Sequence, residues 1–251
     1  MHEQLRLEIQ PQPDDTTCGP TCLHAVYRYF GDGISLEEVI RETPKLDHGG
    51  TLAGLLGTHA LQRGYQATLY TFDIDVFDPT WFRPYQKSPG QHGGEACVSL
   101  IDKLKAEQQA RKSTRIDLAC EAYIEFLELG GRILMRDLSS QLIRDFLRRE
   151  IPILTGLSST YLYRHPREIN PANVDDDVRG VPQGHFVVLC GYDTQHRLVE
   201  VADPYERNPL GEAHYYTVGL SRLVCAILLG ALTLDANLLL IEPQSTQEPP
   251  P

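Results

Sequence analysis

Apolar residues recur at helical spacing between residues 18 and 30, where the side chains from Cys22 to Phe30 favour one face. A proline-rich loop precedes this stretch. Pro20 suits the first turn of a helix, because an N–H group at that position would have no partner within the helix. The pattern therefore predicts a helix that begins at Cys18.

Similar patterns predict the other elements. A period of three to four residues indicates helices, and runs rich in β-branched and aromatic residues indicate strands. Helices are predicted at residues 35–42, 51–63, 139–149 and 221–229 and in two stretches between 95 and 129, and strands at 4–10, 65–72, 133–135, 151–154, 185–192, 198–202, 213–218 and 237–242. Early helices followed by hairpin-forming strands indicate an α+β fold with a mostly antiparallel sheet.

Three segments lack such periodicity. Residues 78–94 are rich in Pro, Gly and aromatic residues, and residues 164–183 are polar, so both are predicted to be loops. The tail, residues 244–251, ends in three prolines and offers no core residue, so we expect it to be disordered. We expect residues 1–243 to form a single domain.

The composition excludes several classes of protein. The 251 residues carry a formal net charge of −11, which argues against a nucleic-acid-binding surface and is compatible with a peptide or protein partner. The N-terminus alternates polar and apolar residues and lacks the apolar core of a signal peptide. No run of about 18 apolar residues occurs, so no membrane span is expected.

The six cysteines are dispersed, as is usual for free thiols in a reducing cytoplasm. No Cys-x-x-Cys pair is present, so a structural zinc site or other metal site is not expected. Cys22 lies one helical turn after Cys18 and is predicted to pack beneath it. The others are expected to be small buried side chains, namely Cys97, Cys120, Cys190 and Cys225.

Cys18 has the position of an activated nucleophile. A thiol at a helix N-terminus faces unpaired N–H groups and the positive end of the helix dipole, and both favour thiolate over thiol. Gly19 lets another group approach the backbone closely. The alternative is a buried cysteine with a packing role.

His185 and Asp203 are candidates for the base and for the residue that orients it. His185 begins the most hydrophobic predicted strand, and Asp203 ends the strand expected to pair with it, so a regular hairpin places the two nearly opposite each other. Gly184 leaves room for a substrate or for the helix that begins at Cys18. The alternatives are a core histidine and an Asp-Pro turn.

Gln12 and Asp176 are further candidates. The amide of Gln12, six residues before Cys18, can donate to an oxyanion together with the Cys18 N–H. Asp176 belongs to an acidic run before His185 and can attract a cationic substrate group. Each is alternatively a solvated loop residue.

These motifs resemble those of the C39 peptidases, which are papain-like cysteine proteases. The matching segments are Gln12 with Cys18-Gly19-Pro20, then Gly184-His185-Phe186-Val187-Val188-Leu189, then Asp203-Pro204. The resemblance implies a papain-like fold in which the cysteine is the nucleophile, the histidine the base, the aspartate its orienter and the glutamine an oxyanion donor. It requires no cofactor.

The resemblance covers residues 10–72 and 139–205, and the stretch from about 78 to 135 is expected to be a helical insertion. Better-known members are fused to ABC transporters and cut after a double glycine, whereas this chain resembles a stand-alone member. Three hypotheses follow: a peptidase or amide hydrolase, an acyltransferase or transpeptidase with an amine acceptor, and a non-catalytic peptide-binding module.

Overall fold

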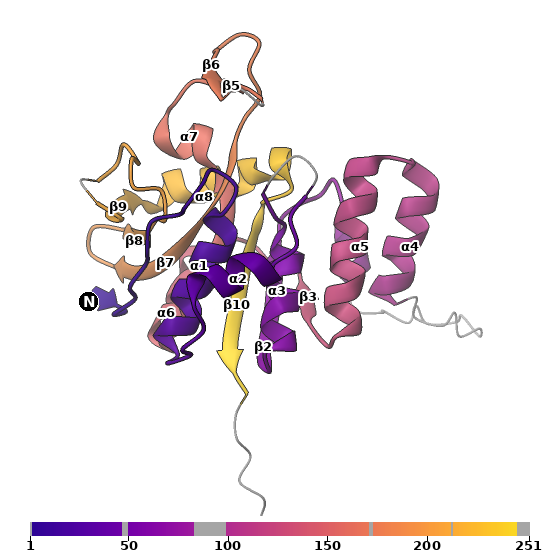
Figure 1. The fold of residues 1–251 in the computed structure, drawn as a ribbon, viewed down its shortest axis with the longest axis horizontal. Helices are drawn as coiled ribbons and strands as arrows, with labels where there is room; N and C mark the ends of the chain where they lie inside the picture. Colours follow the sequence, from indigo (N-terminus) through magenta and orange to yellow (C-terminus); the bar gives the residue numbers. More distant parts are fainter. Residues whose placement is uncertain (1, 47–49, 83–98, 171–172, 212, 245–251) are drawn as a thin grey trace, which may run out of the picture.

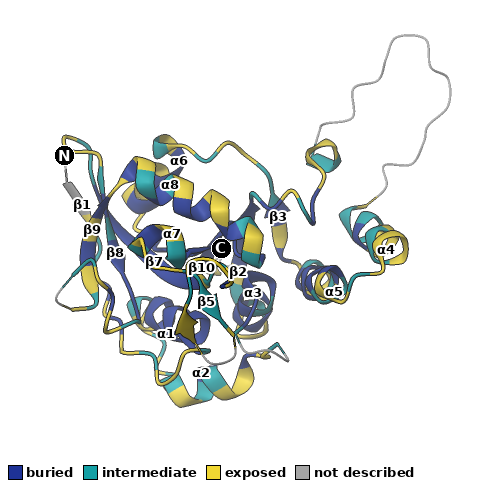
Figure 2. Ribbon diagram, turned by 90° about the horizontal axis from the view of Figure 1, so that it is seen from above, coloured by how far each residue is buried: buried dark blue, intermediate teal, exposed yellow. Residues whose placement is uncertain are grey.

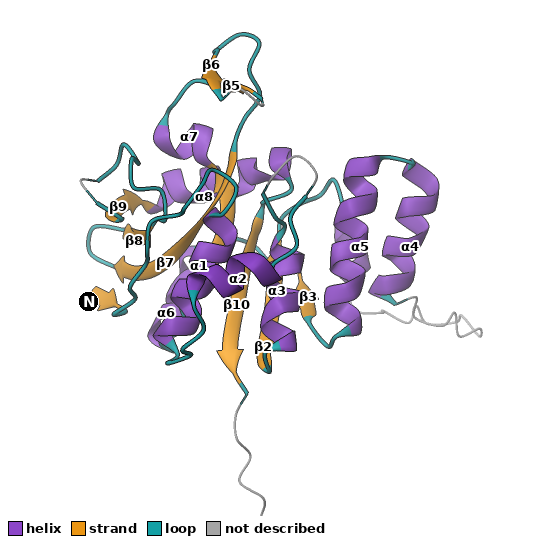
Figure 3. Cartoon of the chain, in the orientation of Figure 1, coloured by secondary structure: helices purple, strands orange, loops and turns teal. Residues whose placement is uncertain are grey.

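A twisted sheet forms the centre of the computed structural model, which describes residues 2–46, 50–82, 99–170, 173–211 and 213–244 (Figures 1 and 3). The described strands run in the order β3-β2-β10-β4-β7-β8-β9, and β1 pairs with β7 outside this path. Their bounds are β1 His2–Gln4, β2 Tyr65–Thr71, β3 Arg132–Leu134, β4 Ile153–Ser158, β7 Gly184–Asp193, β8 Leu198–Ala202, β9 Tyr215–Gly219 and β10 Asn237–Pro243. Among these pairs β2 and β3 are parallel and the others antiparallel.

Helices cover both faces of the sheet. Figure 2 shows α1, α2 and α3 on one side of the strands and α6 and α8 on the other. A separate hydrophobic cluster fills each interface. The helices are α1 Cys18–Tyr29, α2 Leu36–Glu42, α3 Ala53–Gln62, α4 Leu100–Arg111, α5 Thr114–Glu128, α6 Ser140–Arg148, α7 Ser159–Tyr163 and α8 Leu220–Leu229, with short 3₁₀ turns at η1 Pro79–Phe82 and η2 Gly230–Thr233.

The ends of the first helices follow from local chemistry. Gly31 adopts φ +81° directly after the C-cap of α1, a conformation that suits glycine. At the start of α2 the Ser35 side chain accepts from the Glu38 N–H, and the Glu38 carboxylate accepts from the Ser35 N–H. These caps end α1 and begin α2, and α1 packs against both α2 and β7.

The longest described strand is β7, which lies between β4 and β8 in the interior of the sheet. Its first half pairs with β4, and its second half pairs with β8 and β1. The register against β8 shifts between Leu189 and Gly191, so this hairpin contains an irregularity. The N-terminal end of β7 lies next to the N-terminus of α1, where the candidate catalytic residues are found.

The α+β class and the mostly antiparallel sheet are confirmed, and so are most predicted elements. The predicted strand at 4–10 is wrong beyond Gln4. Leu7 and Ile9 are buried, and the Tyr215 hydroxyl satisfies the Leu7 C=O and the Ile9 N–H. The alternation in this segment therefore reflects side-chain burial on an extended segment rather than pairing with another strand.

Short elements escaped prediction. The helix α7 and the small hairpin of β5 Glu168–Ile169 with β6 Val174–Asp175 lie in or beside the predicted loop 164–183. Cys225 is exposed, contrary to its predicted burial, because it faces outward on α8. Cys97, most of the predicted 78–94 loop and nearly all of the predicted tail lie outside the described residues.

The helices α4 and α5 correspond to the predicted insertion and stand to one side of the sheet in Figure 1. Tyr123 and Phe126 of α5 are buried in the same hydrophobic cluster as α1 and α3. A Cβ on Gly57 of α3 would lie 2.5 Å from the Phe126 ring, so the two helices approach closely there. No described helix is long and apolar enough to cross a membrane.

Candidate active site

Cys18 is the first residue of α1 and lines a pocket while remaining 8% exposed. The N-cap residue, Thr17, makes no side-chain hydrogen bond to the first turn, because its hydroxyl donates to the Asp14 C=O at 2.9 Å. The N–H groups at the start of α1 therefore have no side-chain cap from this residue. A Cβ on Gly19 would lie 2.6 Å from Thr51 Cγ2, which shows why glycine follows Cys18.

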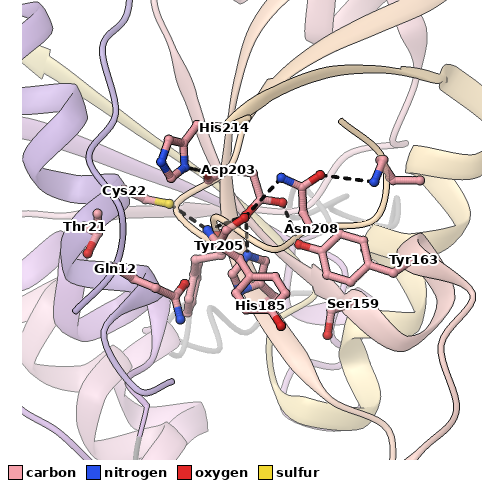
Figure 4. Close-up of polar contacts among 12 residues, drawn as sticks. Gln12, Thr21, Cys22, Ser159, Tyr163, His185, Asp203, Tyr205, Asn208 and His214 are labelled. Carbon is pink, nitrogen blue, oxygen red and sulfur yellow. Dashed lines mark hydrogen bonds and ion pairs between the residues drawn. The ribbon is translucent and has the colours of Figure 1, made fainter. Parts of the chain in front are cut away.

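His185 is fixed by Asp203. Its Nε2 atom lies 2.8 Å from Asp203 Oδ1, and both residues are buried (Figure 4). The two are diagonal neighbours rather than directly opposite, because Val188 pairs with Ala202 in the observed register. Since Nε2 bonds Asp203, the other ring nitrogen, Nδ1, remains for the Cys18 side.

Asp203 receives hydrogen bonds on both carboxylate oxygens. Oδ1 also accepts from the Tyr205 N–H at 2.9 Å, while Oδ2 accepts from the hydroxyls of Tyr163 at 2.6 Å and Tyr216 at 2.8 Å (Figure 4). Neither tyrosine was predicted from the sequence as part of the site. The alternation of β9, which buries Tyr216, was a signal for one of them, and no local signal pointed to Tyr163.

These contacts set the charge state of the pair. Burial alone would lower the pKa of His185, but the charge and hydrogen bond of Asp203, with a smaller contribution from Cys18 as a hydrogen-bonding neighbour, raise this pKa to about 10. Burial opposes ionisation of Asp203, yet His185 and the hydrogen bonds from Tyr163 and Tyr205 lower its pKa. The arrangement favours an imidazolium–carboxylate pair beside the thiol.

Gln12 lines the smaller of two pockets that border His185. Its backbone N–H donates to the Pro204 C=O at 2.9 Å, which fastens it to the segment after Asp203. Its side-chain Nε2 donates to the Asp14 C=O at 2.9 Å, and Oε1 is buried without a hydrogen-bond partner. Because the amide nitrogen carries two protons, one N–H remains for another acceptor.

Two pockets meet at His185. The larger has a cavity volume of about 860 Å³ and contains Cys18, and the smaller, about 390 Å³, contains Gln12. Both are bordered by Gly184 and His185. A substrate that spans both pockets would pass directly over the segment that carries His185.

The other two sequence candidates differ in position. Gly184 lies where the pockets meet. Asp176 lines neither pocket, because its carboxylate accepts from the N–H groups of Val178 and Arg179 and from the Arg179 side chain. The preceding residue, Asp175, lines the smaller pocket instead.

Cys22 is placed differently from Cys18. It is fully buried, and its Sγ atom lies 3.2 Å from the Phe186 carbonyl oxygen (Figure 4). Burial raises the pKa of the Cys22 thiol well above its ordinary value, with like-charge contributions from Cys18 and Asp203.

Within the described part of the chain, no group of three or more His, Cys, Asp and Glu side chains is arranged to hold a metal ion.

Comparison with known proteins gives structural similarity only. No protein-family model matches the chain, and no curated protein matches it. A putative C39-like peptidase from Bacillus anthracis has a TM-score of 0.47 and 14% identity, with 98% of this chain and 100% of that chain covered. Xylellain, a cysteine protease from Xylella fastidiosa, has a TM-score of 0.43 and 13% identity, with 96% and 85% covered.

A third similar structure is a double glycine motif protease from an AMS/PCAT transporter, solved in complex with a leader peptide. It has a TM-score of 0.45 and 12% identity, with 96% of this chain and 94% of that chain covered. The similar structures thus include the C39-like class that the sequence motifs resemble.

Proposed function

We propose that the chain is a cysteine peptidase that forms an acyl-enzyme on Cys18. His185 is its base, Asp203 orients the base, and Gln12 with the Cys18 N–H donates to the oxyanion. The observation that carries this proposal is the buried 2.8 Å contact between His185 Nε2 and Asp203 Oδ1, beside a pocket lined by Cys18. A histidine fixed through Nε2 keeps Nδ1 available for a thiol.

The reaction follows from these positions. In the resting site the proton lies on His185 as an imidazolium and Cys18 is the thiolate, whose Sγ forms a bond to the carbonyl carbon of the substrate while the C=O π electrons move to the oxygen. His185 then gives the proton to the leaving amine as the C–N bond breaks, which leaves a thioester on Cys18. Water adds to the thioester as the neutral His185 takes its proton, the C–S bond breaks, and a carboxylic acid is released with the thiolate and imidazolium restored.

The oxyanion has two candidate donors. The first turn of α1 presents its N–H groups without a cap from the Thr17 side chain, and the Gln12 amide has one N–H to spare. Such donors act most strongly where water is excluded. The partial burial of Cys18 is consistent with such a setting.

A peptide library tests the proposal. We expect the wild-type protein to hydrolyse some members, and Cys18→Ala and His185→Ala to hydrolyse none. The matched control is Cys225→Ala, since Cys225 is an exposed thiol outside both pockets. Equal hydrolysis by wild type and Cys18→Ala would refute the proposal.

The nature of the acceptor is measured in the same assay. Addition of a panel of amines, with the product masses recorded, separates hydrolysis from transfer to an amine. Hydrolysis products alone indicate a peptidase, and amide products indicate an acyltransferase. A thiol-alkylating reagent that fails to modify Cys18 in the folded protein would favour a non-catalytic binding module.

A further inference from the structure

Asp235 lies in the larger pocket with Cys18 and His185, although it is 6% exposed. It precedes β10, and its carboxylate occupies the space above Gly184. A Cβ on Gly184 would lie 2.0 Å from Asp235 Oδ2 and 2.7 Å from Thr233 Oγ1. Glycine at this position therefore makes room for a carboxylate next to the residue that precedes His185.

This carboxylate has no cation in direct contact, and the charges of His185 and Arg115 act on it without forming an ion pair. Among the described residues, no Lys, Arg or His nitrogen forms an ion pair with Asp235. The Thr233 hydroxyl donates to the Gly230 C=O at 3.1 Å and is also a hydrogen-bonding neighbour of Asp235 that lowers its pKa. Arg115 uses its guanidinium on the carbonyls of Ala231 and Leu232. Burial makes the ionised form of Asp235 costly, so a bound cation would stabilise that form.

The surroundings of Asp235 are acidic as well. Burial first, and then the charge of Asp73, raise the pKa of Asp235 to about 7. Asp15 borders both pockets, and Glu168 and Asp175 line the smaller one. The described residues that line the two pockets include no Lys or Arg. Lys45 contacts the hydroxyl of the lining residue Thr16 at 3.5 Å.

We infer that the larger pocket binds a basic side chain of the substrate, a lysine or an arginine close to the scissile bond, with Asp235 as the carboxylate that receives it. The bound cation supplies a counter-charge for Asp235, and its N–H groups donate hydrogen bonds to the carboxylate oxygens of Asp235. The acidic rim attracts the same group from solution. This inference rests on the proposed function for the position of the bond, but the charge of the pocket is measurable without catalysis.

Charged thiol reagents measure this charge directly. The 2-aminoethyl and 2-sulfonatoethyl methanethiosulfonates transfer a cationic or an anionic thioalkyl group to a thiolate and release methanesulfinate. Cys18 lines the pocket, and the exposed Cys225 serves as a reference thiol in the same molecule. Mass spectrometry of the peptides gives the ratio of cationic to anionic rates at each cysteine. We expect the ratio at Cys18 to exceed that at Cys225 by about tenfold.

The variant Asp235→Asn assigns the effect to one carboxylate. We expect it to lower the ratio at Cys18 about fivefold, because one negative charge leaves a desolvated pocket, and to leave the ratio at Cys225 unchanged. The matched control is Asp145→Asn, which removes an exposed carboxylate on α6 outside both pockets. Equal ratios at the two cysteines, or a ratio at Cys18 that is unchanged in Asp235→Asn, would overturn the inference.

Matched peptides test the substrate itself. Active members of the library are resynthesised with norleucine in place of lysine and citrulline in place of arginine near the cleaved bond. We expect wild type to prefer the basic peptide in kcat/KM by about tenfold or more, and Asp235→Asn to lose this preference. Cleavage without such a preference contradicts the inference and leaves the proposed function intact. Absence of cleavage contradicts the proposed function, and the reagent ratios still decide on the pocket.

Discussion

The hydroxyl of Tyr163 lies 2.6 Å from Asp203 Oδ2, the carboxylate oxygen that His185 does not use. Tyr216 approaches the same oxygen from β9 at 2.8 Å. Burial and the neighbouring carboxylate raise the pKa of both tyrosines well above the ordinary value, so both remain proton donors. The orientation of His185 is thus controlled by residues from two separate elements that never contact a substrate carbonyl in the proposed reaction.

Removal of the Tyr163 hydroxyl should therefore weaken the support of Asp203. For Tyr163→Phe we expect a loss of about 1 to 2 kcal/mol in the free energy of unfolding, since a buried acceptor loses one donor. We expect kcat to fall as His185 gains freedom. Urea unfolding and peptide hydrolysis give the two quantities.

A matched control is Tyr161→Phe, because Tyr161 is 43% exposed and two residues away on the same helix. The double variant Tyr163→Phe/Tyr216→Phe should lose more stability than the two single losses combined, since Asp203 Oδ2 then has no donor. Strict additivity, or equal effects at Tyr161 and Tyr163, would contradict a shared role on Asp203.

We expect the Gln12 amide to stabilise the transition state and not the bound substrate. For Gln12→Ala we expect kcat to fall by about 10² to 10³, the usual effect of removing one oxyanion donor. The rate of Cys18 alkylation should stay the same, because the thiol and His185 are unchanged. Steady-state kinetics and iodoacetamide labelling measure these two rates.

The neighbouring variant Gln10→Ala is the control, since Gln10 is exposed and lines neither of the two pockets at His185. If Gln12→Ala raises KM and leaves kcat unchanged, Gln12 binds the ground state, and its assignment to the oxyanion is wrong.

The sequence predicted those parts of the site that depend on local pattern. Cys18 could be predicted because helix periodicity and Pro20 define the start of α1. His185 and Asp203 could be paired because a short turn brings two apolar segments into a hairpin. Their relation was predicted as nearly opposite, and the observed pairing of Val188 with Ala202 makes them diagonal neighbours. The shift between Leu189 and Gly191 lies farther along the hairpin, and periodicity alone carries no signal for it.

Features that depend on distant segments could not be predicted. Tyr163 reaches Asp203 from α7, a five-residue helix without a periodic pattern. Asp235 acquires its position because the turn before β10 packs over Gly184, and the local sequence around Asp235 carries no signal for that contact. Asp175 rather than Asp176 lines a pocket, because the Asp176 carboxylate accepts hydrogen bonds within the hairpin turn.

The contact between Gly184 and Asp235 predicts a specific steric conflict. In Gly184→Ala the new methyl group meets Asp235 Oδ2, and we expect a loss of about 1 to 3 kcal/mol in the free energy of unfolding from overpacking. The variant Gly184→Ala/Asp235→Ala should regain most of this loss, because the second change empties the occupied space. Chemical unfolding of the two single variants and the double variant measures the coupling. A control is Gly219→Ala, whose Cβ meets no atom within 4 Å.

Three buried groups give the stability an unusual dependence on pH. Burial raises the pKa of Asp235 from 3.8 to about 7 and that of Asp73 from 3.8 to about 6, and Asp203 raises that of His185 from 6.5 to about 10 against the opposing effect of burial. In each case the folded state keeps a proton that the unfolded chain has released. The free energy of unfolding therefore falls as the pH rises, first between about 4 and 7 and then between about 6.5 and 10.

Replacement of Asp235 separates these contributions. The variant Asp235→Asn cannot titrate at this position, so its stability should fall less steeply between pH 4 and 7, by up to about 1.4 kcal/mol per pH unit. The groups that influence Asp235 are Thr233, Asp73, His185 and Arg115, and they remain in the variant. Urea unfolding at intervals from pH 4 to 9 gives both slopes, with Asp145→Asn as a control that should follow wild type. A steeper fall of the free energy of unfolding with pH in wild type would also mean that ionisation of Asp235 destabilises the fold at neutral pH. A bound cation would offset this destabilisation. If the free energy of unfolding depends on pH in the same way in Asp235→Asn and wild type, Asp235 is already ionised throughout this range. A group other than a proton would then stabilise the buried carboxylate.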